Sequence, residues 1–233
     1  MDRFAVVFML LLVVTSVSRA NDAPGDILRS SMSIKGTWQR LVDHPDARVW
    51  EPQVADRVGP WQSVKVPGPL MREEENTRGD RINAECVWLQ RSFQLTEQQA
   101  SRHVVLRWGG IRFGAMAWVN GRQVADHAPV SPHTVVLPRD LTREGKNRIL
   151  LRVHGWAGVP KSESGYPLIP AGGSTQGWGA KGPATHEDIW LEFYDRALMK
   201  WILAVPDIDR QEVTFRIWFD GPGKLPEELE LNA

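Results

Sequence analysis

The sequence has very little cysteine and no excess of either charge. Cys86 is the single cysteine among 233 residues, so no intrachain disulfide can form and a packed core must stabilise the fold. The 28 Lys and Arg residues balance the 28 Asp and Glu residues. Without a net field, the chain has no general attraction for nucleic acid or for an anionic membrane. The composition therefore favours neutral partners.

Long segments with a helical period are also missing. The chain offers short segments in which apolar and polar residues alternate, separated by glycine, proline and charged residues. Alternation with a period of two is typical of strands. Many short strands and almost no helix predict an antiparallel β-sandwich. We expect the strands at residues 35–40, 61–66, 87–95, 103–108, 113–119, 133–137, 147–154 and 188–194.

The most informative stretch is residues 103–126. Asn120-Gly121 within it tolerates positive φ at both central positions of a type I′ turn. The chain is expected to reverse there, so that residues 123–124 pair back against residues 118–119. The stretch is therefore predicted to form the middle of an antiparallel sheet rather than one unit of a parallel repeat.

The alternation also predicts which charged residues lie on the outer face of the sheet, away from the core. In residues 147–154, every second residue is apolar, which places Arg148 and Arg152 on the outer face. In residues 188–194, Glu192 is expected to point outward in the same way. Water at such a position keeps a carboxylate ionised.

Residues 1–20 have the features of a signal peptide. Arg3 precedes an apolar run at residues 4–14, and Ser18-Arg19-Ala20 has small residues at the two positions that signal peptidase recognises. The run is too short to span a bilayer. We expect cleavage after Ala20 and a periplasmic or secreted protein with no membrane contact afterwards. The alternative is a buried N-terminal helix.

Five segments together resemble the front of family 2 glycoside hydrolases, which include β-galactosidases, β-glucuronidases and β-mannosidases. The joint presence of a WVNG hairpin and an IWLE strand carries the resemblance, which implies a jelly-roll, galactose-binding-like sandwich. The segments are WQSVKVP (61–67), VWLQRSF (87–93), LRWGGIRFGAMAWVNG (106–121), NRILLRV (147–153) and EDIWLE (187–192).

The resemblance also implies a division of the chain. Strand candidates at residues 198–205 and 212–219 would open an immunoglobulin-like domain. So few strands leave sheet edges uncovered, so this part must pack on the first domain, pair with something else or be poorly ordered. The expected parts are a signal peptide (1–20), a linker (21–33), the jelly roll (34–195) and the truncated second domain (196–233).

In the resembled family, two carboxylates about 5 Å apart perform the hydrolysis, and a (β/α)₈ barrel carries them. No such barrel fits in 233 residues already assigned to strands. None of the Asp or Glu residues matches the family's catalytic motifs. We therefore expect no catalytic residue, metal or cofactor in this chain, and a downstream catalytic domain as its partner.

Three segments suggest other chemistry, and each has a plainer explanation. His186-Glu187-Asp188 has no second His or Cys at metal-ligand spacing, and adjacent strand residues would point to opposite faces. The glycine-rich residues 171–174 lack the Lys and Ser or Thr that complete a phosphate loop. The acidic run at residues 73–75 has no apolar period and indicates an exposed loop.

The connection between His154 and Glu187 is long enough to be functional. It carries Trp156, Tyr166 and Trp178 among glycines and prolines. Indole faces stack well on the C–H faces of sugars, and the resemblance implies that this loop reaches toward the sugar pocket. The three aromatic residues are therefore candidates for sugar binding, with capping of the sandwich edge as the alternative for the two tryptophans.

These observations predict the non-catalytic front of an exported family 2-like glycoside hydrolase, with carbohydrate, a β-glycoside, as its ligand. Two alternatives stay open. One is a stand-alone carbohydrate-binding or interaction module, and the other is the front domain of another carbohydrate-active enzyme such as an esterase.

Overall fold

The computed structural model describes residues 5–10, 29–43, 60–72, 85–128, 132–166, 168, 182–195 and 198–220. The chain divides into two compact units. One is Ser31–Phe193, and the other combines Met1–Ser30 with Tyr194–Ala233. Most of the described residues are in strands, with one short helix among them.

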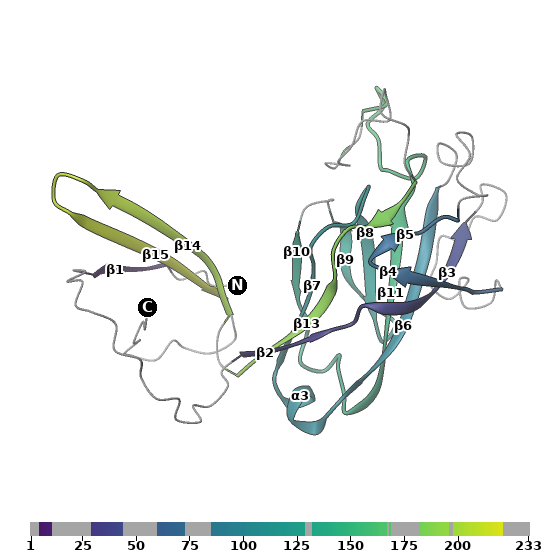
Figure 1. Ribbon diagram of the computed structural model, residues 1–233, viewed down its shortest axis with the longest axis horizontal. Helices are drawn as coiled ribbons and strands as arrows, with labels where there is room; N and C mark the ends of the chain where they lie inside the picture. Colours follow the sequence, from purple (N-terminus) through teal and green to yellow (C-terminus); the bar gives the residue numbers. More distant parts are fainter. Residues whose placement is uncertain are drawn as a thin grey trace. The chain divides into compact units, whose positions relative to one another are not determined.

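Two antiparallel sheets face each other in the first unit (Figure 1). The six-stranded sheet has the order β4-β3-β6-β11-β8-β9, and the four-stranded sheet has the order β10-β7-β13-β2. The predicted β-sandwich is therefore confirmed. The strands are β2 (Arg29–Ser33), β3 (Gly36–Asp43), β4 (Gln62–Val66), β6 (Cys86–Leu95), β7 (His103–Trp108), β8 (Ala115–Val119), β9 (Arg122–Ala128), β10 (His133–Val136), β11 (Gly145–His154) and β13 (Ile189–Tyr194). A further small sheet pairs β5 (Gly68–Pro69) with β12 (Ala184–Thr185).

One continuous hydrophobic core lies between the two large sheets. Trp38 of β3, Trp108 of β7 and Phe193 of β13 are among its largest fully buried side chains. The Trp38 indole N–H donates to the Ile34 carbonyl at 2.8 Å, so its polar atom is satisfied. Burying a large apolar side chain contributes roughly 1.5–3 kcal/mol, which makes this core the main source of stability.

The outer face of the six-stranded sheet is also covered. It carries a second apolar cluster that includes Cys86, Trp88 and Trp118, and the two indole rings lie 5.5 Å apart. Arg152 lies on this face, opposite Trp88 in the register. However, Arg152 is only 2% exposed. The outward position of Arg152 was predictable, whereas its burial was not, because a period of two says nothing about what covers the outer face.

The prediction that Glu192 points into water is wrong. Glu192 of β13 is buried, with 6% of its surface exposed. The Arg107 guanidinium of β7 donates to its carboxylate at 3.4 Å. The pair explains how a carboxylate is tolerated there, because a buried charge needs a partner.

The stretch predicted as the middle of one sheet is divided between the two. β7 lies in the four-stranded sheet, whereas β8 and β9 form one edge of the six-stranded sheet. Phe113 and Gly114 have φ values of 66° and 80°, and this irregular backbone carries the chain from one sheet to the other. The central position predicted for the hairpin is therefore wrong. Its antiparallel pairing is confirmed, because Trp118 lies opposite Gln123.

The short helix α3 (Glu97–Ser101) was not predicted. It begins with a capping box, in which the Gln99 backbone N–H donates to Thr96 Oγ1 at 3.2 Å and the Thr96 N–H donates to the Gln99 side chain at 3.0 Å. Thr-x-x-Gln is the sequence signature of this cap. Because α3 buries none of its residues, it has no apolar period to reveal it. Figure 1 shows α3 at one end of the sandwich.

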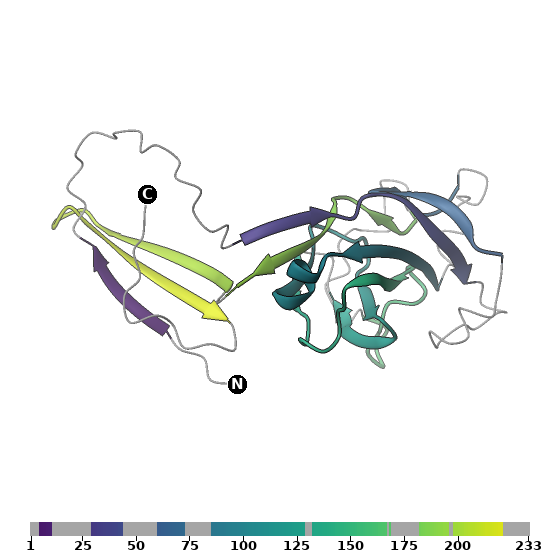
Figure 2. The same ribbon diagram turned by 90° about the horizontal axis from the view of Figure 1, so that it is seen from below.

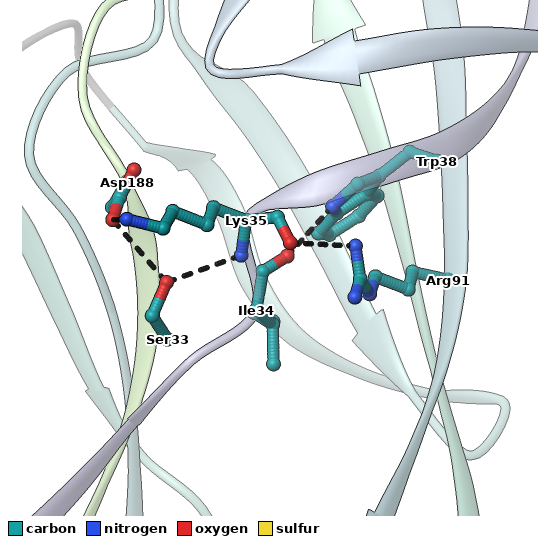
Figure 3. Close-up of polar contacts among 6 residues, drawn as sticks. All are labelled: Ser33, Ile34, Lys35, Trp38, Arg91 and Asp188. Carbon is teal, nitrogen blue, oxygen red and sulfur yellow. Dashed lines mark hydrogen bonds and ion pairs between the residues drawn. The ribbon is translucent and has the colours of Figure 1, made fainter.

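Figure 3 shows the corner where β2 leads into β3. Ser33 Oγ donates to the Asp188 carboxylate at 3.2 Å, and Lys35 Nζ lies 3.7 Å from the same carboxylate. Arg91 of β6 donates to the Lys35 carbonyl at 2.8 Å. Backbone polar groups at a sheet corner lack ladder partners and need others. Arg91, which interrupts the apolar face of its strand, meets that need.

The turn between β8 and β9 has positive φ at both central residues. Asn120 has a φ of 48° and Gly121 a φ of 87°, which are values typical of a type I′ turn. Asn120 is held further by its side chain, since Nδ2 donates to the Leu141 carbonyl at 2.7 Å and Oδ1 accepts from the Arg148 N–H at 2.9 Å. The turn is therefore anchored to β11 and to the connection before it.

Replacing Gly121 with valine is expected to lower the free energy of unfolding by about 1–3 kcal/mol, because a β-branched residue at positive φ is strained. A Cβ at this position would meet no atom within 4 Å, so backbone strain alone produces the loss. Urea denaturation of both proteins measures it. An unchanged midpoint would contradict the prediction.

The second unit contains β1 (Ala5–Leu10), β14 (Leu198–Asp207) and β15 (Glu212–Asp220) in the order β1-β15-β14. Figure 2 shows β1 running beside β15, with which it pairs antiparallel. β1 falls inside the expected signal peptide, whose cleavage stays a prediction. Removal of residues 1–20 would open this edge of β15.

Candidate functional site

A cavity of about 590 Å³ lies at the small sheet formed by β5 and β12. Its wall comes from three parts of the sequence that are far apart: the residues after β4, the residues between β7 and β8, and the residues before β13. The lining residues are Pro67, Gly68, Pro69, Met71, Arg112, Gly182, Pro183, Ala184, Thr185 and His186.

Backbone and hydroxyl hydrogen bonds join these parts. The Arg112 N–H donates to the Ala184 carbonyl at 2.8 Å. Thr185 Oγ1 accepts from the Gly68 N–H at 3.0 Å and donates to the Gly68 carbonyl at 3.3 Å. The cavity wall is thus fixed by the fold, and the Thr185 hydroxyl is already engaged.

Among the described lining residues, Arg112 and His186 are the ionisable ones, and none is Asp or Glu. Arg112 is partly buried. Within the described part of the chain, its guanidinium has no ion pair and no hydrogen-bond acceptor. The cavity therefore presents a cation whose donors are uncommitted there.

The acidic residues that follow His186 point elsewhere. Glu187 packs on Gly109, where a Cβ would overlap its carboxylate. Asp188 binds Ser33 and Lys35, as Figure 3 shows. These residues lie between β12 and β13, so the assumption that they alternate along a strand is wrong. In the described ranges, no three His, Cys, Asp or Glu side chains could hold a metal ion.

Of the sugar-binding candidates, Trp156 and Tyr166 are described, and neither is among the described lining residues of this cavity. Trp156 packs on Phe113, with ring centroids 5.9 Å apart and planes at 60°, and Lys161 Nζ lies 5.5 Å from the Trp156 ring. Tyr166 is 73% exposed. Trp178, residues 171–174 and the acidic run at residues 73–75 lie outside the described residues. The role of the three aromatic residues in sugar binding stays a prediction.

The sequence did not reveal Arg112 or His186 as partners in one cavity. Arg112 lies between β7 and β8, His186 directly follows β12, and the bridge between Ile111 and Thr185 brings them together. No residue spacing in the sequence predicts such a long-range pair, because a contact between distant strands depends on the whole fold. Among the described wall residues, the Pro67-Gly68-Pro69 turn and Gly182-Pro183 carry turn signals in the sequence.

A histidine pair, in which His154 is buried and His127 is partly exposed, forms a second polar cluster. The rings of His127 and His154 are stacked, with His127 Nδ1 3.1 Å from His154 Nε2. Arg152 Nη1 lies 3.4 Å from His154 Nδ1, and Asp126 Oδ1 lies 3.6 Å from His127 Nε2. Since arginine can only donate, His154 Nδ1 accepts, and Nε2–H of the neutral ring donates to His127. His127 Nδ1 therefore accepts this hydrogen bond, and the proton of His127 lies on Nε2, which faces Asp126.

The free energy of unfolding is expected to fall by about 2 kcal/mol between pH 7 and pH 5 because of His154. Burial, with Arg152 and His127 adding to it, lowers the pKa of His154 to about 3. The unfolded chain takes up this proton near pH 6.5, whereas the folded chain resists it. The contribution is therefore complete above pH 6.5 and is lost as the pH falls toward 3.

Urea denaturation at the two pH values measures this loss. The His154→Gln variant should lack about 2 kcal/mol of it, because glutamine does not titrate. Burial also lowers the pKa of His133, so a smaller loss in the same direction should remain. An identical pH dependence in the variant would contradict the assignment.

Comparison with solved structures places the fold. No protein-family model and no curated protein matches the sequence. A β-glucuronidase from an uncultured Clostridium species matches with a TM-score of 0.60 at 15% identity, over 93% of this chain and 36% of that one. The chain has a β-sandwich fold like the N-terminal domains of family 2 glycoside hydrolases.

Other matches agree. A β-glucuronidase from Ruminococcus gnavus in complex with D-glucuronic acid has a TM-score of 0.60 at 12% identity, over 91% of this chain and 37% of that one. A β-D-mannosidase from Dictyoglomus thermophilum has a TM-score of 0.59 at 12% identity, over 82% of this chain and 26% of that one. This chain spans between 26% and 37% of the length of these proteins. No helix among the described residues is long and apolar enough to cross a membrane.

Proposed function

We propose that this chain is the non-catalytic front portion of an exported family 2-like glycoside hydrolase that acts in carbohydrate metabolism. The fold carries the proposal, because it matches such enzymes over 93% of this chain and only 36% of the matched one. The chain would contribute to carbohydrate binding, and a further domain would supply the catalytic barrel. Export follows from the signal-like residues 1–20.

The placement of acidic residues supports the non-catalytic part. A retaining glycosidase needs two carboxylates about 5 Å apart that face the substrate, one ionised and one protonated. In the described part of this chain, Glu187 and Asp188 point away from the cavity to Gly109 and to the corner at Ser33. Glu192 is paired with Arg107. None of these carboxylates is presented to a bound sugar.

The purified chain is expected to give no turnover above the buffer rate with the nitrophenyl β-galactoside, β-glucuronide or β-mannoside. A coupled barrel would be required to bring both carboxylates to the glycosidic bond. Release of nitrophenol measures the rate at neutral pH. Turnover that disappears when a single Asp or Glu is changed to its amide would contradict the proposal.

The cavity beside β5 and β12 also fits one alternative, a stand-alone carbohydrate-binding module. In that case the chain alone would bind sugar, with millimolar affinity at best for one open site. Trp156, Tyr166 and Trp178 remain the proposed stacking residues. Neither the front portion of an enzyme nor a stand-alone module is expected to turn over substrate, so the turnover assay does not distinguish them. Association with a separate catalytic domain would distinguish them.

A further inference from the structure

The cavity beside β5 and β12 has one uncommitted charge. Arg112 carries five N–H donors and cannot lose its proton in a protein. In the described residues, its guanidinium has no partner, and the cavity lining has no carboxylate. Of the neighbouring acids, Asp188 binds Ser33 and Lys35, and the Glu187 side chain packs on Gly109. The charge of Arg112 is thus available to a ligand.

The remaining wall is largely apolar and rigid. Pro67, Pro69, Met71 and Pro183 line it, and prolines offer flat C–H surfaces with little conformational freedom to lose. A volume of about 590 Å³ lies within the range of small-ligand sites, which combine apolar walls with a few fixed polar groups. The cavity therefore suits a saturated ring that carries a negative group.

We propose that this cavity binds a sugar acid, with the carboxylate on the Arg112 guanidinium and the sugar ring against the prolines. A guanidinium matches a carboxylate with two parallel hydrogen bonds, which gives direction as well as attraction. His186 lines the same cavity. The sugar part of the ligand rests on the proposed function, and the acidic part rests on the cavity alone.

The test compares two ligands that differ only at the charged group, methyl β-glucuronide and methyl β-glucoside. Both are titrated into the full chain by calorimetry. We expect a millimolar dissociation constant for the glucuronide and binding at least about ten-fold weaker for the glucoside, a difference of about 1.4 kcal/mol. Arg112→Gln should remove the preference for the acid, and Arg112→Lys should keep part of it as a point charge.

Arg122→Gln is the matched control, because Arg122 is half-exposed and pairs with Asp140 at 3.0 Å on a different turn. It should leave the preference unchanged. Urea denaturation of each variant checks that the fold is intact, which is expected because the Arg112 guanidinium holds no described partner.

Equal binding of the two glycosides would overturn the acid assignment and still support carbohydrate binding. Displacement of the glucuronide by equimolar inorganic phosphate would mean a general anion site and would also overturn the proposal. Absence of glucuronide binding at tens of millimolar, or an acid preference that survives Arg112→Gln, would overturn it as well. The turnover assay does not depend on any of these binding results. It therefore tests the non-catalytic part of the proposed function separately.

Discussion

Replacing Asn147 with alanine is expected to lower the free energy of unfolding by about 3 kcal/mol. Asn147 is 1% exposed. Its Nδ2 donates to the carbonyls of Arg143 at 2.7 Å and Gly145 at 3.0 Å, and its Oδ1 accepts from Asn120 Nδ2 at 2.8 Å and the Arg143 N–H at 3.1 Å. Alanine would leave these buried partners without their hydrogen bonds. The loss is large because each unsatisfied buried group costs about 1–3 kcal/mol.

Urea denaturation measures this effect against a matched amide. Gln123→Ala removes an exposed amide whose hydrogen bonds, to the Ala125 carbonyl and to Asp126, are both long at 3.4 Å. That control should stay within about 0.5 kcal/mol of the parent protein. If Asn147→Ala behaved like Gln123→Ala, the side-chain network at the β8–β9 turn would contribute nothing measurable.

Replacing Gly158 with alanine is expected to destabilise the protein by about 3 kcal/mol for a different reason. A Cβ at Gly158 would overlap the Glu85 carbonyl oxygen and lie 2.8 Å from its carbon. These are backbone atoms, and the same carbonyl accepts the Gly155 N–H at 2.8 Å. Because the overlapped atoms are backbone atoms, no side-chain rotation can relieve the overlap. The backbone must therefore shift, and the hydrogen bond from Gly155 to the Glu85 carbonyl is lost.

Gly165→Ala is the control for Gly158→Ala. Gly165 lies in the same connection with a φ of 82°, and a Cβ there would meet nothing within 4 Å. This variant should cost about 1 kcal/mol through backbone strain alone. Denaturation midpoints of the two variants compare steric overlap with strain. Equal losses would show that the contact with Glu85 is not tight.

The sequence by itself determined the local structure. Alternating residues predicted most strands to within a few positions, as for β6 and β11, because the two faces of a strand are set by adjacent residues. Asn120-Gly121 predicted the reversal between β8 and β9 because few other residues adopt positive φ at both positions. The Thr96 capping box, which could have revealed α3, was also present in the sequence.

Only the tertiary structure decided how these strands are shared between sheets and what covers them. β7 and β8 are neighbours in the sequence but lie in different sheets. Arg152 and Glu192 are both buried, and each lies beside a residue distant along the chain, Trp88 and Arg107 respectively. The cavity has the same origin, because the pairing of β5 with β12 brings Gly68 to Thr185 and places Arg112 beside both. Such pairings depend on contacts between residues far apart in the sequence, which no local period records.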